Sequence, residues 1–168
     1  SGAFVTETPS AAPTAIGVLG APWRVEVDPC GCLTVDSAGG RRSRRSDRAS
    51  ATLDWWVLAE DRLHDPRTEA SVRQRRVEGT PVLETRVRVP GGDVVQRVFA
   101  VADHGGVVII EIENESPASI AVLFSHGKLL SQRPSSSVEA TGLGVPPGAV
   151  SFPVAHRSSG SEEHTSEL

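Results

Sequence analysis

The sequence predicts an all-β chain that folds as an antiparallel two-layer β-sandwich. Apolar and polar residues alternate with a period of two in several short segments, and clusters of Gly, Pro, Asn and Asp separate these segments. No segment shows the i, i+3, i+4, i+7 apolar stripe of an amphipathic helix. A chain of 168 residues suits one domain and is long enough to bury a sizeable core.

The first predicted hairpin covers residues 23–35. Trp23, Val25 and Val27 alternate with charged residues, as expected of a half-buried strand. The sequence Asp-Pro-Cys-Gly at 28–31 is typical of a turn, and the strand that follows returns through Leu33 and Val35.

Residues 53–58 predict a strand that carries two adjacent tryptophans. Leu53, Trp55 and Val57 are expected on one face, with Trp56 on the other, because neighbouring side chains of a strand point in opposite directions. One tryptophan is therefore expected in the core, and the other is either exposed or covered by a loop. The polar stretch 60–67 that follows is predicted to be a loop or short turn.

From residue 72 to residue 125 the pattern predicts a meander of successive strands joined by short turns. The first strand, at 72–77, is strongly basic. The sequence Pro-Gly-Gly-Asp at 90–93 is a strong hairpin signal, and the strand at 107–113 is the most apolar. The earlier hairpin and the tryptophan strand are expected to supply the second layer.

The two ends of the chain are predicted to differ from the sandwich, which is placed at residues 22–155. Residues 1–21 are rich in Ser, Thr, Ala, Pro and Gly and predict a flexible linker. A last strand is expected at 150–155. The region 156–168 predicts a disordered tail, so the sandwich is expected to be truncated at its C-terminal end.

The final residues, Ser-Glu-Glu-His-Thr-Ser-Glu-Leu at 161–168, resemble the conceptual translation of a widely used sequencing adaptor. We interpret 161–168 as non-native; the alternative is an ordinary acidic terminus. Without its three glutamates, the formal net charge changes from −4 to −1. This balance does not favour a nucleic-acid partner. No stretch approaches the roughly 18 apolar residues that a membrane span needs, and no membrane partner is expected.

The sequence contains no recognisable catalytic motif. We therefore predict no catalytic, cofactor-binding or metal-ligating residue. Cys30 and Cys32 are the two cysteines, too few for a structural zinc site, and we interpret them as inert thiols beside a turn. The arginine-rich run at 39–50 is either a phosphate-binding loop or, as we prefer, a solvated connection. Trp55 and Trp56 are the candidate ligand contacts, with core packing as the preferred alternative.

Two stretches of the sequence resemble a known family: E-T-R-V-R-V-P-G-G-D-V-V-Q-R-V-F-A-V and V-V-I-I-E-I-E-N-E-S-P-A-S-I-A-V-L-F-S. They resemble the N-terminal β-sandwich of large bacterial glycosidase-like proteins, in which an (α/α)6 toroid follows and carries the catalytic acids. The resemblance covers roughly residues 53–155. The excess of Arg over Lys, with abundant Ala, Gly, Pro and Val, is typical of GC-rich coding, as in actinobacteria.

The resemblance implies a non-catalytic accessory domain of a carbohydrate-active protein. Its partner would be a catalytic domain of the same parent chain, a glycoside hydrolase, with carbohydrate as a further candidate partner. This domain would have no activity alone, and one of its apolar faces would stay exposed. The alternative is an autonomous immunoglobulin-like binding or adhesion module, for which a polar exterior is expected.

Overall fold

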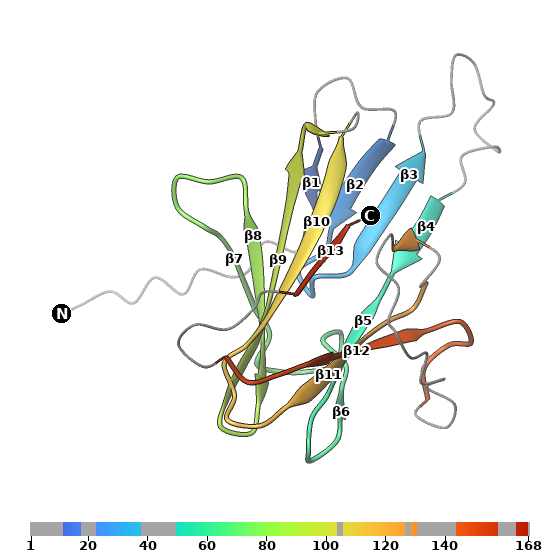
Figure 1. Cartoon of the computed structure of the whole chain (residues 1–168). Helices are drawn as coiled ribbons and strands as arrows, with labels where there is room; N and C mark the ends of the chain where they lie inside the picture. Colours follow the sequence, from blue (N-terminus) through green and yellow to red (C-terminus); the bar gives the residue numbers. More distant parts are fainter. Residues whose placement is uncertain are drawn as a thin grey trace.

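A computed structural model describes residues 12–17, 23–37, 50–103, 106–126, 129–130, 144–157 and 164–167 of the chain (Figure 1). These residues are mostly β-strand, and every strand pairs with its neighbours in the antiparallel sense. The predicted all-β antiparallel fold class is therefore confirmed.

The strands form three sheets. The first has the order β1 (Thr14–Ile16), β2 (Trp23–Val27), β3 (Leu33–Ser37) and β4 (Ser50–Leu53). The second has the order β12 (Val150–Val154), β11 (Ile120–Phe124), β5 (Trp55–Leu58) and β6 (Leu63–His64). The third, with five strands, has the order β13 (His164–Glu167), β10 (Val107–Asn114), β9 (Gly92–Val101), β8 (Leu83–Val89) and β7 (Arg73–Arg76).

One hydrophobic core draws side chains from all three sheets, with the two four-stranded sheets together facing the five-stranded one. Hydrogen bonds between side chains and carbonyls also connect the layers. The Trp23 indole donates to the carbonyl of Gly106 at 3.1 Å. Asn114, at the end of β10, donates its amide to the carbonyl of Val154 at 3.3 Å. The arrangement is a sandwich whose second layer is itself made of two sheets.

The strand predicted at 53–58 divides at Asp54, and its two parts belong to different sheets. The residues before Asp54 pair with β3, and the residues after it pair with β11. Ser125 holds this point: Asp54 N–H donates to the Ser125 hydroxyl at 2.9 Å, and Ser125 N–H donates to the Asp54 carbonyl at 2.9 Å. The alternation of side chains continues across this break: Leu53, Trp55 and Val57 all lie in the core, as predicted.

The predicted meander ends at β10, and this part of the prediction is wrong. The strand β11 leaves the five-stranded sheet and pairs with β5 and β12. Asn114, which is 1% exposed, organises the connection: its side-chain oxygen accepts hydrogen bonds from the N–H and hydroxyl of Ser116. A turn of this length is compatible with either a hairpin or a change of layer, and period-two patterning does not distinguish them.

Three short strands lie where the sequence predicts irregular structure. Leu63–His64 forms β6 within the predicted loop 60–67 by pairing with β5. Thr14–Ile16 forms β1 within the predicted linker 1–21, and burial of Ile16 explains why it is ordered. The third, His164–Glu167, pairs with β10 within the predicted disordered tail. Ladder hydrogen bonds between backbones are largely independent of side-chain identity, so a free edge pairs with many sequences.

Two further local predictions agree with the structure. The hairpin at 90–93 joins β8 to β9, and the last predicted strand of the sandwich is β12. Most of the arginine-rich run at 39–50 lies outside the described residues, and its two interpretations stay predictions. In the described part of the chain, no helix has the length and apolar composition needed to cross a membrane.

Candidate binding groove

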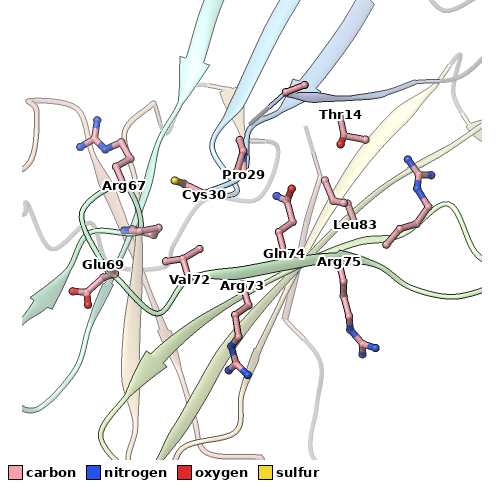
Figure 2. Close-up of a pocket in the computed structure, with 13 residues that line it drawn as sticks. Thr14, Pro29, Cys30, Arg67, Glu69, Val72, Arg73, Gln74, Arg75 and Leu83 are labelled. Atoms are coloured by element: carbon pink, nitrogen blue, oxygen red, sulfur yellow. The ribbon is translucent and has the colours of Figure 1, made fainter. Parts of the chain in front are cut away.

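A groove of about 670 Å³ lies along β7, between this strand and the turn that joins β2 to β3 (Figure 2). The strand β7 has the sequence Arg-Gln-Arg-Arg and is the last strand of its sheet. A strand with no apolar face cannot be buried on either side, so it is stable only at an edge. The sequence showed that this strand is basic, and its lack of an apolar face was the signal for an edge position.

The opposite wall of the groove is the turn Asp28–Cys32. The Asp28 carboxylate accepts the N–H groups of Cys30 and Cys32 at 2.8 and 3.0 Å, which closes the turn around a single side chain. Gly31 has φ +82°, a conformation that favours glycine. The Gln74 amide bridges the two walls, because it donates to the Asp28 carbonyl at 2.7 Å and to Thr85 Oγ1 at 3.1 Å.

Both cysteines lie in this turn as free thiols. Burial, with a smaller contribution from Asp28, raises the pKa of the Cys30 and Cys32 thiols. Both are therefore protonated at neutral pH, the form that reacts poorly and binds metals poorly. This agrees with the interpretation of inert thiols beside a turn.

Arginines line much of the groove, and several already hold a carboxylate. Arg73 contacts Asp93 at 2.7 Å, and Arg75 contacts Glu84 at 3.0 Å. These two arginine side chains nevertheless stay 55% and 65% exposed. Figure 2 shows both pointing away from the Asp28–Cys32 turn, whereas Gln74 points toward it.

Arg67 lies at one end of the groove and binds two carboxylates. It contacts Asp65 at 2.9 Å and Asp54 at 3.4 Å. Its guanidinium also lies over the ring of Trp56, 5.5 Å from the ring centroid. Burial opposes ionisation of Asp65, but hydrogen bonds from Arg67 outweigh this and lower the pKa of that carboxyl. Arg67 thus ties the loop after β6 to the surface of β5.

The two tryptophans predicted as ligand contacts are both buried, with exposures of 1% for Trp55 and 3% for Trp56. Trp55 belongs to the core, and its indole N–H donates to the Cys30 carbonyl at 2.9 Å. Trp56 lies outside that core cluster, beneath Arg67. The arrangement supports core packing for Trp55 and a loop cover for Trp56. Ligand contact by either ring stays a prediction, and this arrangement gives it no support.

The outer face of the five-stranded sheet has a charged half centred on Glu84. This carboxylate is 2% exposed and accepts hydrogen bonds from Arg75, Arg86 and Arg97 at 3.0, 2.8 and 3.1 Å. Burial would raise its pKa, but the arginines outweigh burial, and the pKa of Glu84 falls to about 2. Arg97 extends the network across β10 to Glu111 and Glu113 at 3.0 and 2.7 Å.

The other half of this outer face is apolar. It consists of two cross-strand pairs of β9 and β10, Phe99 with Ile109 and Val101 with Val107, which we call the outer apolar patch. All four side chains are half-buried and do not belong to the hydrophobic core or to the side chains packed against it. The core-facing residues of β9 lie on the other side of the strand, and they are Val94, Gln96 and Val98.

The buried histidine of β6 has two acidic neighbours. His64 Nε2 lies 2.9 Å from Asp61 Oδ1, and His64 Nδ1 lies 3.3 Å from Glu69 Oε1. Glu69 is in turn held by Arg62, which lowers the pKa of that carboxyl. The hydrogen bond with His64 lowers the pKa of Asp61. This cluster fixes the β6 hairpin. Among the described residues, no group of three or more His, Cys, Asp or Glu side chains is arranged to hold a metal ion.

Comparison with protein-family models, with curated proteins and with solved structures found no match for this chain.

Proposed function

We propose that this chain is a non-catalytic accessory β-sandwich domain of a carbohydrate-active, glycosidase-like protein, and that it packs against a catalytic domain of the same polypeptide. The observation that carries the proposal is the outer apolar patch formed by Phe99, Val101, Val107 and Ile109. Contiguous apolar side chains on the outer face of a sheet mark surfaces that another protein covers.

The carboxyl groups with a shifted pKa hold structural ion pairs. Glycoside hydrolysis needs a general acid whose pKa is raised, so that it carries a proton at neutral pH. The described carboxyl groups with a shifted pKa are all shifted downward, and they are Asp61, Asp65, Glu69, Glu84 and Glu113. Each of them has an arginine or histidine partner that keeps it ionised.

The link to carbohydrate chemistry depends on the resemblance of residues 53–155 to sandwich domains that precede a catalytic toroid. An autonomous immunoglobulin-like module is the competing proposal, and a polar exterior is expected for it. The charged half of the outer face fits both proposals. The outer apolar patch favours the accessory domain, because the exterior of an autonomous module is expected to be polar.

The test begins with the coding sequence that surrounds this chain in its genome. We expect it to encode a helical domain with paired carboxylates. Produced as a separate polypeptide, that domain should bind this chain in a titration followed by calorimetry. Replacing Val107 and Ile109 by lysine should weaken the association at least tenfold, because two charges would be buried at the contact. Glu78→Lys, in the exposed turn after β7, is the control and should leave the affinity unchanged.

Two results would contradict the proposal. One is a coding sequence without a neighbouring helical domain, and the other is an association that is insensitive to the lysines in the outer apolar patch. Release of reducing sugar from maltooligosaccharides by this chain alone would contradict the non-catalytic part.

A further inference from the structure

We propose that the outer edge of β7, with which no described strand pairs, binds an extended acidic segment of another polypeptide, which adds as a further strand to the five-stranded sheet. The proposal concerns the groove side of the molecule and does not depend on the function of the outer apolar patch. It follows from the direction of the backbone groups of β7, from the space beside them and from the charge along the edge.

The backbone of β7 presents hydrogen-bonding groups to the groove. Val77 N–H donates to the Val82 carbonyl at 2.9 Å, which places Val77 at a hydrogen-bonded position of the β7–β8 ladder. In an antiparallel pair these positions alternate, so the N–H and C=O groups of Arg75 also point toward β8. Those of Gln74 and Arg76 therefore point away from β8, toward the groove. No described strand pairs with this side of β7.

The groove has room for a strand. Paired strands lie about 4.8 Å apart. The volume beside β7 is about 670 Å³, and its far wall includes Thr14 and the turn residues Pro29 and Cys30. A strand added at the edge would lie beside β7 in the plane of the sheet, with this wall on the side toward which Gln74 points.

The charge along the edge selects the partner. Arg73 and Arg75 each use one nitrogen for the carboxylates that they contact, and an arginine has five N–H donors. Both are more than half exposed. Arg76 is exposed and forms no ion pair with a described carboxylate. Glu69 is the one carboxylate in the described lining of the groove, and Arg62 already engages it. The free donors favour an acidic segment.

The pleat of the sheet defines the pattern of that segment. Side chains on the added strand would alternate between the outer face, beside Arg73 and Arg75, and the groove, beside Gln74. Carboxylates are therefore expected at every second position. A second copy of β7 is a poor partner, because antiparallel self-pairing would place arginines beside arginines. Exposed charges also discourage non-specific pairing of an edge, which leaves a strand with complementary charge as the matching partner.

The experiment uses the whole chain and two labelled synthetic peptides of ten residues. In one peptide Glu alternates with Thr, and in the other Lys alternates with Thr. Fluorescence anisotropy at low salt should show saturable binding of the Glu peptide, and affinity at least tenfold lower for the Lys peptide. Raising the salt concentration should weaken binding of the Glu peptide, because the added strand lies at the surface.

A matched pair of variants tests the backbone contact. Arg76→Pro removes an N–H that points to the groove without breaking the β7–β8 ladder, since proline is tolerated at an edge position of this kind. Arg76→Ala removes the same side chain and keeps the N–H. We expect Arg76→Pro to bind the Glu peptide at least fivefold more weakly than Arg76→Ala does. Equal affinities would overturn the proposal, as would equal binding of the two peptides or no binding of the Glu peptide.

Amide hydrogen exchange on the unmodified chain provides a second measurement in case the proline variant does not fold. The Glu peptide should slow exchange at Gln74 and Arg76 and leave Arg75 unchanged, because Arg75 N–H is already bonded to β8. Protection of all three amides alike, or of none, would overturn the added strand. Concentration-dependent dimerisation that Arg76→Pro abolishes would identify a second copy as the occupant and would also overturn it.

Discussion

Glu84 and Gln96 lie on neighbouring strands of the five-stranded sheet, on opposite faces, and are buried to almost the same degree. Glu84 is 2% exposed on the outer face, and Gln96 is 0% exposed on the core face. Three arginines donate to Glu84. Neither the side-chain oxygen nor the side-chain nitrogen of Gln96 has a hydrogen-bond partner in the described part of the molecule.

The difference shows that the free-energy cost of burying a polar group depends on whether its surroundings supply hydrogen-bond partners, and not on burial alone. At the outer face, long arginine side chains reach the carboxylate from three strands, and that of Arg75 stays 65% exposed. In the interior, the neighbours of Gln96 have other partners: Trp55 donates to the Cys30 carbonyl, and Gln74 donates to Thr85. We therefore expect Glu84 to stabilise the fold and Gln96 to weaken it.

The largest effect is expected at Glu84. Glu84→Ala should lower the free energy of unfolding by about 3 kcal/mol, because three arginines lose their shared carboxylate in a buried position. Urea denaturation measures this change. Glu78→Ala, in an exposed turn, is the control and should change stability by less than about 0.5 kcal/mol. A similar loss in both variants would show that the network does not stabilise the sheet.

The pH dependence of stability should report the same carboxylate. The pKa of Glu84 in the folded protein is about 2, below the ordinary value of 4.5. Its ionised form therefore stabilises the fold above pH 4.5, and this stabilisation is lost as the pH falls toward 2. Compared with Glu84→Gln, the unmodified chain should lose about 2 kcal/mol more over this interval. Parallel stability curves of the two proteins would contradict the low pKa.

Gly31 tests how tightly the interior is packed around Gln96. A Cβ at Gly31 would lie 2.5 Å from Gln96 Oε1, and the positive φ adds strain. Gly31→Ala should therefore lower stability by about 2 kcal/mol or more. Gly79→Ala is the control, since Gly79 has φ +72° but no atom within 4 Å of the position that an added methyl group would take. It should lose only about 1 kcal/mol from backbone strain. Equal losses would mean that the contact with Gln96 relaxes freely.

The smallest effect is expected at Gln96 itself, and its sign is opposite. Gln96→Met keeps the length of the side chain and removes two polar atoms that have no partner among the described residues. Thermal denaturation should show a gain of about 0.5–1 kcal/mol. A loss of stability in this variant would indicate that Gln96 has a hydrogen-bond partner, such as buried water, and would remove the contrast with Glu84.

Much of the fold was predictable from local patterns. Alternation identified the strands that contain Val25, Val87 and Val98, and turn residues identified the hairpin at 90–93. The break at Asp54 and the departure of β11 were not predictable in the same way. Both depend on which strand becomes the neighbour, and Ser125 settles this through hydrogen bonds to a residue 71 positions away.

The candidate groove shows the same division. The basic character of β7 and the turn chemistry of Asp28–Gly31 were visible in the chain. The sequence did not show that β7 and this turn face each other across a groove. Gln74 and Asp28, which form the hydrogen bond between them, are 46 residues apart in the chain. The tryptophan pair illustrates the limit further: opposite faces followed from the pleat, but the burial of Trp56 depends on Arg67 and the loop that carries it.

The sequence by itself determined the all-β class and the antiparallel hairpins, because these depend on a side-chain period of two and on the conformations of Gly, Pro and Asp. Only the tertiary structure decided which strands share a sheet, which face stays apolar at the surface, and which buried polar groups find partners. These outcomes depend on contacts between residues far apart in the chain, and no local pattern encodes them.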